Sequence, residues 1–227
     1  MGRVAPLELA GPPMTPLLSE GQRDAALQAV LDDLVPVAPA ADAASGSALV
    51  PADGDLVTAW RRLPAESAQF ADFPDGIDER LRAALAAGGI TRPYTHQADA
   101  MEHVLAGRHV VTITPTASGK TLCYNGPVLS HILQDHSTRA LYLFPTKALA
   151  QDQLAELLTL TARLEEHASI GAHTYDGDTP QDARRAVRGR AHLVLTNPDM
   201  LHSGILPHHP RWAKLFENLR YVVIDEL

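Results

Sequence analysis

One stretch of the chain, residues 114–121 with the sequence TPTASGKT, has the composition of a phosphate-binding loop. It follows an apolar run, residues 109–113, that we expect to form a buried strand, and it precedes a segment with helical spacing. In such a loop the backbone N–H groups converge on phosphate oxygens, and Gly119 allows close approach because it has no Cβ. Lys120 would reach the β- and γ-phosphates, and the Thr121 hydroxyl suits Mg²⁺.

The loop departs from the usual pattern at its first position, where Thr114 stands in place of glycine. The alternative is a chance strand–turn–helix that carries a surface lysine. The strand and helix signals on either side favour the binding loop. We therefore predict that the chain binds a nucleoside triphosphate with Mg²⁺ through Thr114, Pro115, Thr116, Ala117, Ser118, Gly119, Lys120 and Thr121.

A second group with suitable chemistry follows the last apolar run, Tyr-Val-Val-Ile at residues 221–224. If that run is a strand of a parallel sheet, Asp225 and Glu226 lie at its carboxyl end. A carboxylate there can hold the Mg²⁺ that bridges the β- and γ-phosphates, which we assign to Asp225. Glu226 could polarise the attacking water as a general base. The alternative, two acidic residues in a surface turn, is disfavoured by the strand and by the loop upstream.

The pattern of the second half of the chain predicts the elements that position these groups. Near-continuous apolar strands alternate with helices, which indicates an α/β parallel sheet of three layers with helices on both faces. Ligands bind at the carboxyl edge of such a sheet. We expect strands at 109–114, 140–144, 169–175, 191–196 and 220–225, and helices at 77–87, 95–106, 121–134, 147–167, 180–189 and 199–206.

The front of the chain differs in composition. Residues 1–55 are expected to form an appendage with a short helix over 20–35 and a linker rich in proline and alanine. Residues 56–227 would form the α/β domain. A single cysteine, Cys123, allows no intramolecular disulfide, which fits a reducing cytoplasm. We find no signal peptide and no apolar stretch of membrane-spanning length, so we expect a cytoplasmic protein without a membrane partner.

The net charge of −8 argues against a simple basic nucleic-acid binder, but the charge is unevenly distributed. Residues 1–88 carry 13 acidic and 6 basic side chains, whereas residues 89–227 carry 14 acidic and 13 basic ones. A nearly neutral domain can still bind phosphates locally through helix N-termini and a few basic side chains. The charge therefore decides neither for nor against nucleic acid.

Two more strand ends have sequences suited to a phosphate. Phe-Pro-Thr-Lys at residues 144–147 and Thr-Asn-Pro-Asp at 196–199 each precede a predicted helix, as does Tyr-Asp-Gly-Asp-Thr-Pro at 175–180. Taken singly, each is explained by ordinary helix capping. Their joint occurrence in this order is not. The residues expected to contact a nucleic-acid backbone are Pro145, Thr146, Lys147, Gly177, Thr196, Asn197 and Pro198.

In this order, YTHQ, TPTASGKT, FPTKALAQDQ, TYDGDTP, TNPDM and VVIDE resemble the Q motif, motifs I and Ia, the glycine motif, and motifs Ib and II of superfamily 2 helicases. Together with FADFP they are most similar to DExH-type DNA helicases of the bacterial mitomycin-repair group. The resemblance implies a P-loop NTPase of RecA-like fold, adenine recognition by Gln97 with Tyr94 nearby, and roles for Lys120, Asp225 and Glu226 in ATP hydrolysis. It also implies sequence-independent binding of single-stranded DNA, or of DNA with a single-stranded tail.

The chain departs from the family pattern after Asp225 and Glu226, where the sequence stops. The resemblance therefore leads us to expect an incomplete first lobe that lacks the second RecA-like lobe and its arginines, and that is inactive alone. A non-catalytic, nucleotide-dependent binding module remains the alternative, and a small-molecule kinase is disfavoured by the strand-end loops. We expect Arg184, Arg185, Arg188 and Arg190 to form a solvated helix face, with contact to nucleic acid as the alternative. We expect His202, His208 and His209 to be loop residues, with a metal site as the alternative.

Overall fold

The computed structural model describes residues 67–115, 118–164 and 169–226, together with Ala25 and Ala29. The predicted appendage and linker over residues 1–55 therefore lie outside the described residues, apart from these two alanines, which are helical. All the other described residues belong to the unit that begins at Ser67.

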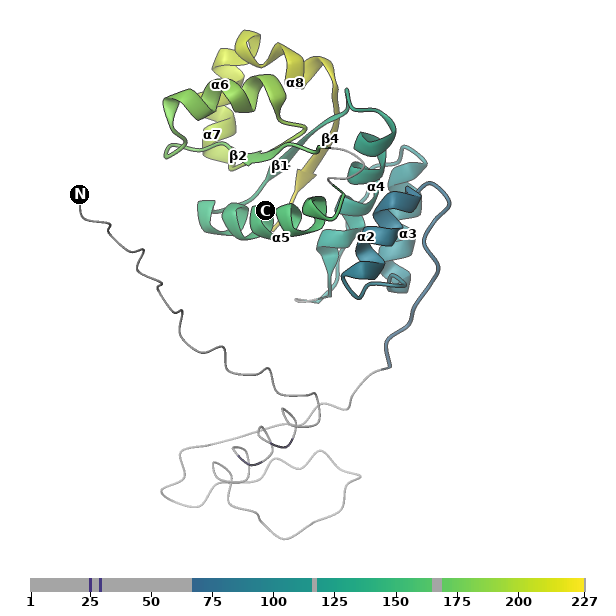
Figure 1. The fold of residues 1–227 in the computed structure, drawn as a ribbon. Coiled ribbons are helices and arrows are strands. Elements are labelled where there is room, and N and C mark those ends of the chain that lie inside the picture. Colours follow the sequence, from purple (N-terminus) through teal and green to yellow (C-terminus); the bar gives the residue numbers. More distant parts are fainter. Residues whose placement is uncertain (1–24, 26–28, 30–66, 116–117, 165–168, 227) are drawn as a thin grey trace, which may run out of the picture. The chain divides into compact units, whose positions relative to one another are not determined.

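A four-stranded parallel sheet lies at the centre of this unit (Figure 1). Its strands are β1 (Arg139–Leu143), β2 (Ala172–Thr174), β3 (Leu193–Thr196) and β4 (Leu219–Ile224), and their order is β2-β3-β1-β4. β1 pairs in parallel with both β3 and β4, and β2 pairs with β3. The parallel α/β sheet predicted from the sequence is confirmed.

Helices connect the strands and cover both faces of the sheet (Figure 1). They are α2 (Glu79–Ala87), α3 (Thr95–Leu105), α4 (Lys120–Gln134), α5 (Lys147–Ala162), α6 (Gln181–Arg190), α7 (Pro198–Met200) and α8 (Ala213–Glu217). A π-helical segment (Leu201–Ile205) and a 3₁₀ segment (Leu206–Trp212) link α7 to α8. None of the described helices combines the length and the apolar character needed to cross a bilayer.

The three layers follow from the alternation of side chains along β1. Tyr142 belongs to the larger apolar cluster, which includes side chains of α2, α3, α4 and α5. Leu141 and Leu143 point the other way, into a cluster with Val187 of α6 and Leu215 of α8. Because neighbouring residues of a strand face opposite sides of the sheet, one buried strand supplies both cores.

The expectation of a strand over residues 109–114 is wrong. These residues form no strand, and Val111 and Ile113 are 87% and 90% exposed. β4 lies at the edge of the sheet, and its side chains alternate between half-buried and exposed positions. An apolar run signals a buried strand only when another strand pairs with it. Among the described residues no strand does so here.

The expected helix over residues 199–206 is also corrected. The chain forms three residues of α-helix, then a π-helical turn, and then a 3₁₀ segment that contains Pro207 and Pro210. Proline lacks the backbone N–H that an α-helix needs, so regular i to i−4 bonding cannot continue through these positions. Ile205 of the π-helical segment and Trp212 of the 3₁₀ segment are buried.

The exposed edge of β4 generates a prediction about self-association. Val222 is 53% exposed, and the backbone groups on this edge are available to another strand. We expect the chain to self-associate as its concentration rises, and we expect Val222→Lys to weaken that association because a charge on an edge strand opposes strand pairing. Sedimentation velocity over a concentration series measures it. Leu158→Lys, at an exposed leucine of α5, is the matched control; equal effects of both variants would contradict the edge explanation.

A second prediction concerns acid stability. His192 accepts a hydrogen bond at Nδ1 from the Gly171 N–H, 3.1 Å away, and burial, followed by the charge of Arg139, lowers its pKa from 6.5 to about 4. The folded protein therefore holds His192 as the neutral imidazole. The contribution of His192 to the free energy of unfolding is fully present above pH 6.5 and is lost as the pH falls toward 4. Because the ring is only half-buried, solvent screening weakens this effect, and we expect the free energy of unfolding to drop by about 1–2 kcal/mol from this group.

Urea unfolding at pH 7 and at pH 4.5 tests this expectation. His192→Asn is the control, because the amide oxygen can still accept from Gly171 but does not titrate. The drop between the two pH values should be smaller in His192→Asn than in the wild type. An identical drop in both would show that other groups cause the acid sensitivity.

Candidate nucleotide and nucleic-acid site

The phosphate-loop residues that the structure describes lie at the N-terminus of α4. Gly119 is the N-cap and has a φ of 74°, a conformation that favours glycine. A Cβ built on Gly119 would lie 2.6 Å from Nε2 of Gln97, so the position has no room for a side chain. The hydroxyls of Thr114 and Ser118 are 2.6 Å apart and hydrogen-bond to each other, which joins the two ends of the loop. Thr116 and Ala117 lie outside the described residues.

Lys120 lies back over this loop. Its Nζ donates to the carbonyl oxygens of Thr114 and Pro115, each 3.2 Å away. An ammonium group held by two neutral carbonyls at a helix N-terminus fits a triphosphate, because anionic phosphate oxygens are stronger acceptors than these carbonyls. The described part of the loop therefore places an ammonium group at a helix N-terminus.

The two expected metal ligands are joined by a short chain of hydrogen bonds. Thr121 Oγ1 donates to Gln153 Oε1 at 3.4 Å, and the Tyr124 hydroxyl lies 3.3 Å from Gln153 Oε1 and 3.2 Å from Asp225 Oδ2. A hydroxyl and a carboxylate brought to the same place by two further side chains are the hard oxygen donors that Mg²⁺ prefers. The residues present fit that ion.

Sequence reasoning missed Tyr124 and Gln153. Tyr124 lies one helical turn after Thr121, so the helical period could have placed it on the same face. Gln153 comes from α5, and no local signal joins it to this site. Burial, with a further contribution from the Asp225 carboxylate, raises the pKa of Tyr124, which keeps its hydroxyl a hydrogen-bond donor. Glu226 is exposed and has a φ of 56°.

The Q-motif residues lie beside the phosphate loop. Gln97 is buried; its Oε1 accepts from the Tyr94 N–H and its Nε2 donates to the Gly119 carbonyl, both at 2.8 Å. His96 Nε2 is 3.1 Å from the Ser118 carbonyl oxygen. Tyr94 stacks between the rings of Phe70 and His96, with centroid separations of 5.1 and 5.8 Å. The structure thus brings these residues to the loop backbone, next to an exposed aromatic surface.

The other candidate residues lie where β1, β2 and β3 end. Thr146 caps α5 by accepting from the Leu149 N–H at 3.2 Å, and Asn197 caps α7 by accepting from Met200 at 2.8 Å. Thr196 is buried and donates to the Tyr175 carbonyl at 2.6 Å, so its hydroxyl holds the end of β3 against the end of β2. Pro145 and Pro198 are exposed on the same side of the sheet. Helix capping therefore accounts for the hydrogen bonds of Thr146 and Asn197, and a bond between strand ends accounts for that of Thr196.

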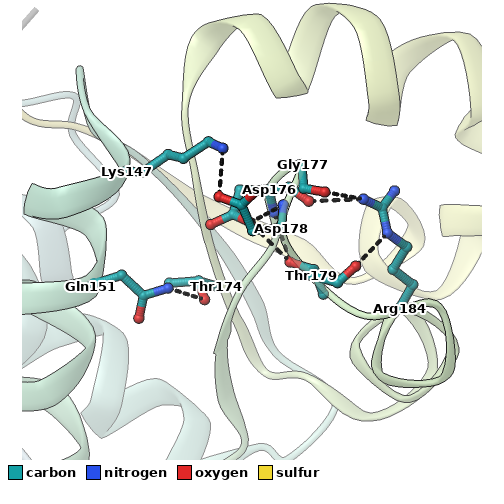
Figure 2. Close-up of polar contacts among 8 residues, drawn as sticks. All are labelled: Lys147, Gln151, Thr174, Asp176, Gly177, Asp178, Thr179 and Arg184. Carbon is teal, nitrogen blue, oxygen red and sulfur yellow. Dashed lines mark hydrogen bonds and ion pairs between the residues drawn. The ribbon is translucent and has the colours of Figure 1, made fainter.

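Lys147 and Gly177 meet above this edge (Figure 2). Lys147 Nζ is 2.7 Å from Asp178 Oδ2, and a Cβ on Gly177 would lie 3.6 Å from the same Nζ. The hydrogen bond with Asp178 raises the pKa of Lys147, and its counterpart lowers the pKa of the carboxylate. At neutral pH both groups are charged, so Asp178 of the loop after β2 forms an ion pair with Lys147 of α5.

Pro180 is the N-cap of α6, and the Thr179 hydroxyl accepts from the Asp176 N–H at 2.9 Å. Two expectations from the sequence are corrected. Arg184 does not lie on a solvated face; it is half-buried and hydrogen-bonds the backbone of the loop before its helix. His202 lies in the π-helical segment, and His208 and His209 lie in the 3₁₀ segment, so these histidines are not loop residues as expected.

The contacts of Gln97 generate a prediction. Gln97→Ala would leave the Tyr94 N–H and the Gly119 carbonyl without this partner, and we expect the free energy of unfolding to fall by roughly 2 kcal/mol. Gln97→Glu keeps the acceptor for Tyr94 but places a buried carboxylate oxygen against the Gly119 carbonyl, so it should lose at least as much stability as Gln97→Ala. Urea denaturation of the three proteins at pH 7 measures both effects. Unchanged stability in Gln97→Ala would contradict the bridging role of this side chain.

The comparisons with known proteins identify the family of the chain. The family description DEAD/DEAH box helicase matches residues 94–227. The uncharacterized ATP-dependent helicase YprA of Bacillus subtilis is 56% identical over 171 residues, which are 75% of this chain and 23% of that protein. ATP-dependent helicase hrq1 of Schizosaccharomyces pombe is 40% identical over 77% of this chain and 17% of its own length.

The crystal structure of the DUF1998 helicase MrfA bound to DNA and AMPPNP is also similar, with a TM-score of 0.67 at 56% identity over 70% of this chain and 22% of that one. The chain thus spans less than a quarter of the length of each relative. The RecA-like fold class and the resemblance to superfamily 2 helicases, including the mitomycin-repair group, are confirmed. On the family match, the similarity in sequence and the shared fold, the chain belongs to the DEAD/DEAH box helicase family.

Proposed function

We propose that this chain is the ATP-binding first lobe of a DNA helicase or translocase, and that it binds ATP with Mg²⁺ at one end and the backbone of single-stranded DNA at the strand-end loops. The observation that carries the proposal is the convergence of Gly119, Lys120 and Thr121 with Asp225 through the contacts of Tyr124 and Gln153. The ATP-dependent relatives and the MrfA complex with DNA and AMPPNP support it.

At the nucleotide, the contacts of Lys120, Thr121 and Asp225 support a role for each, and Glu226 is assigned from its place after Asp225. Lys120 exchanges the carbonyls of Thr114 and Pro115 for phosphate oxygens, so its charge comes to lie on the β- and γ-phosphates. Thr121 and Asp225 are the protein ligands for Mg²⁺, which when bound neutralises charge on the transferring phosphoryl group. Glu226 takes the proton of the attacking water as general base.

At the base, Gln97 and Tyr94 give the site its preference for adenine. The buried amide of Gln97 is fixed by its bonds to Tyr94 and Gly119, and an amide still has one N–H and one lone pair to offer. Tyr94, stacked between Phe70 and His96, is 38% exposed and offers an aromatic face. A donor and an acceptor side by side match the edge of adenine.

At the nucleic acid, the loops after β1, β2 and β3 form one surface. Lys147 supplies a charge, and Gly177 and the helix starts after Thr146 and Asn197 supply backbone N–H groups. Thr196 acts by holding the loops together, because its own hydroxyl is bonded to Tyr175. Contacts of this kind address phosphates and sugars, so binding is independent of sequence and weakens with salt.

Because the chain spans 22–23% of YprA and MrfA, the proposal concerns binding by this lobe and not complete unwinding. We propose that the 227-residue chain alone hydrolyses ATP slowly, since phosphoryl transfer needs positive charges beyond Lys120. The alternative is a nucleotide-dependent nucleic-acid-binding module without useful catalysis in any context. A protein with the remaining motifs that restores DNA-stimulated hydrolysis when added would decide for the helicase.

The first test is nucleotide binding and hydrolysis by the chain, with and without single-stranded DNA. We expect a fluorescent ATP analogue to bind, Lys120→Ala to weaken that binding by at least about tenfold, and DNA to stimulate hydrolysis little. Lys147→Ala is the matched control: it removes one lysine at the other site and should leave ATP binding unchanged while weakening DNA binding. Equilibrium titration and phosphate release measure both.

Two outcomes would contradict the proposal. Robust DNA-stimulated hydrolysis by the isolated chain would show that this lobe is catalytically sufficient. Unaltered nucleotide binding in Lys120→Ala would place the nucleotide elsewhere.

A further inference from the structure

Arg184, in the first turns of α6, is bonded to the loop that precedes its own helix (Figure 2). Its Nε donates to the Thr179 carbonyl at 2.8 Å, and its Nη2 donates to the carbonyls of Asp176 and Gly177 at 3.0 and 3.2 Å. One guanidinium group therefore holds three of the four carbonyls between residues 176 and 179. The planar fork of arginine suits this task, whereas lysine has a single donor nitrogen.

The guanidinium is itself anchored to the core. Its central carbon lies 5.2 Å from the centroid of the Tyr175 ring, and Tyr175 is buried edge-to-face against Trp212 with centroids 4.6 Å apart. The Tyr175 carbonyl also accepts from Thr196. Arg184 thus connects the loop to a buried, well-packed part of the structure and does not merely pack on another surface loop.

The geometry of the peptide unit gives this clamp a consequence on the opposite side of the loop. In a trans peptide the C=O of one residue and the N–H of the next point in opposite directions. Because Arg184 holds the Asp176 carbonyl, the N–H of Gly177 is directed away from Arg184. The ammonium group of Lys147 lies close to the same residue, 3.6 Å from its Cβ position. An N–H and an ammonium group are thereby brought to one exposed place.

We propose that Arg184 is a positioning residue for nucleic-acid binding: it does not contact the strand, but it fixes the 176–179 loop so that the Gly177 N–H and Lys147 bind the same phosphate. The inference rests on the proposed function. In the structure Lys147 forms an ion pair with Asp178. The two side chains are 48% and 83% exposed, respectively. Exposed ion pairs contribute little, so a phosphate can replace the carboxylate.

The test is the affinity of the chain for a fluorescent single-stranded oligonucleotide, measured by anisotropy at fixed salt. Arg184→Ala and Arg184→Lys should each weaken binding by roughly tenfold, because both lose the three-carbonyl clamp. Arg185→Ala is the matched control: Arg185 is the exposed neighbour on the same helix, and its loss changes the net charge as Arg184→Ala does. It should weaken binding by less than about twofold.

A double-substitution cycle separates positioning from an independent structural effect. If Arg184 acts through the phosphate shared with Lys147, the two substitutions should not have additive effects. The double variant Lys147→Ala/Arg184→Lys should then bind the oligonucleotide with about the affinity of whichever single variant binds it less tightly. Additive losses would overturn the inference, and so would wild-type affinity in Arg184→Lys. A thermal melt and binding of the ATP analogue verify that each variant is folded. If Arg184→Ala does not fold, the Arg184→Lys cycle still decides.

Amide hydrogen exchange provides a readout that needs no DNA. Protection in the 176–179 loop should fall in Arg184→Lys and remain in Arg185→Ala; equal protection in both would overturn the clamp. Failure of the proposed function gives a different pattern: the wild-type chain would bind the ATP analogue but no oligonucleotide. That result would remove the nucleic-acid role from Lys147, and the positioning role of Arg184 with it.

Discussion

The parallel pairing of β1 with strands on both sides is the constraint on which both candidate sites depend. Leu143, the last residue of β1, is in register with Thr196 of β3 and with Ile224 of β4. The residues after these three positions therefore emerge at one level of the sheet. Asp225 comes out on one side of β1, where its backbone N–H bonds to the Leu143 carbonyl at 3.0 Å, and Asn197 comes out on the other. A change in the register of β1 with β3 or β4 would move the residues that follow these strands to different levels of the sheet.

Those parts of the fold whose determinants are local could be predicted from the sequence. The start of α3 at Thr95 and of α5 at Lys147, and the end of α4 at Gln134, agree with the expected limits because caps and helical spacing are written in neighbouring residues. The predictions failed where the local structure depends on residues far away in the sequence. Residues 109–114 have a strand sequence but no strand beside them among the described residues, and the role of Arg184 depends on a loop shape that spacing cannot show.

The same distinction applies to the candidate sites. Motif order identified Lys120, Thr121 and Asp225, but the contacts that hold two of them involve Tyr124 and Gln153, and Gln153 comes from another helix. Net charge was equally uninformative, because the surface at the strand ends depends on where a few groups are held. In the nucleic-acid site that we propose, the feature that matters is one lysine, paired with a carboxylate at 2.7 Å beside a glycine, and the total charge of the domain does not reveal it.

α5 connects the two sites directly. Lys147, its first residue, lies at the strand-end loops, and Gln153 bonds to Thr121 and Tyr124 at the nucleotide site. At about 1.5 Å per residue, these two side chains are attached roughly 9 Å apart along one helix. Gln151 of the same helix also donates to Thr174, at the end of β2, at 3.0 Å (Figure 2). Coupling between two ligands requires an element whose position both of them bias. α5 has a contact with each site, so a shift of this helix on phosphate binding at Lys147 would move Gln153 against the hydroxyl of Thr121.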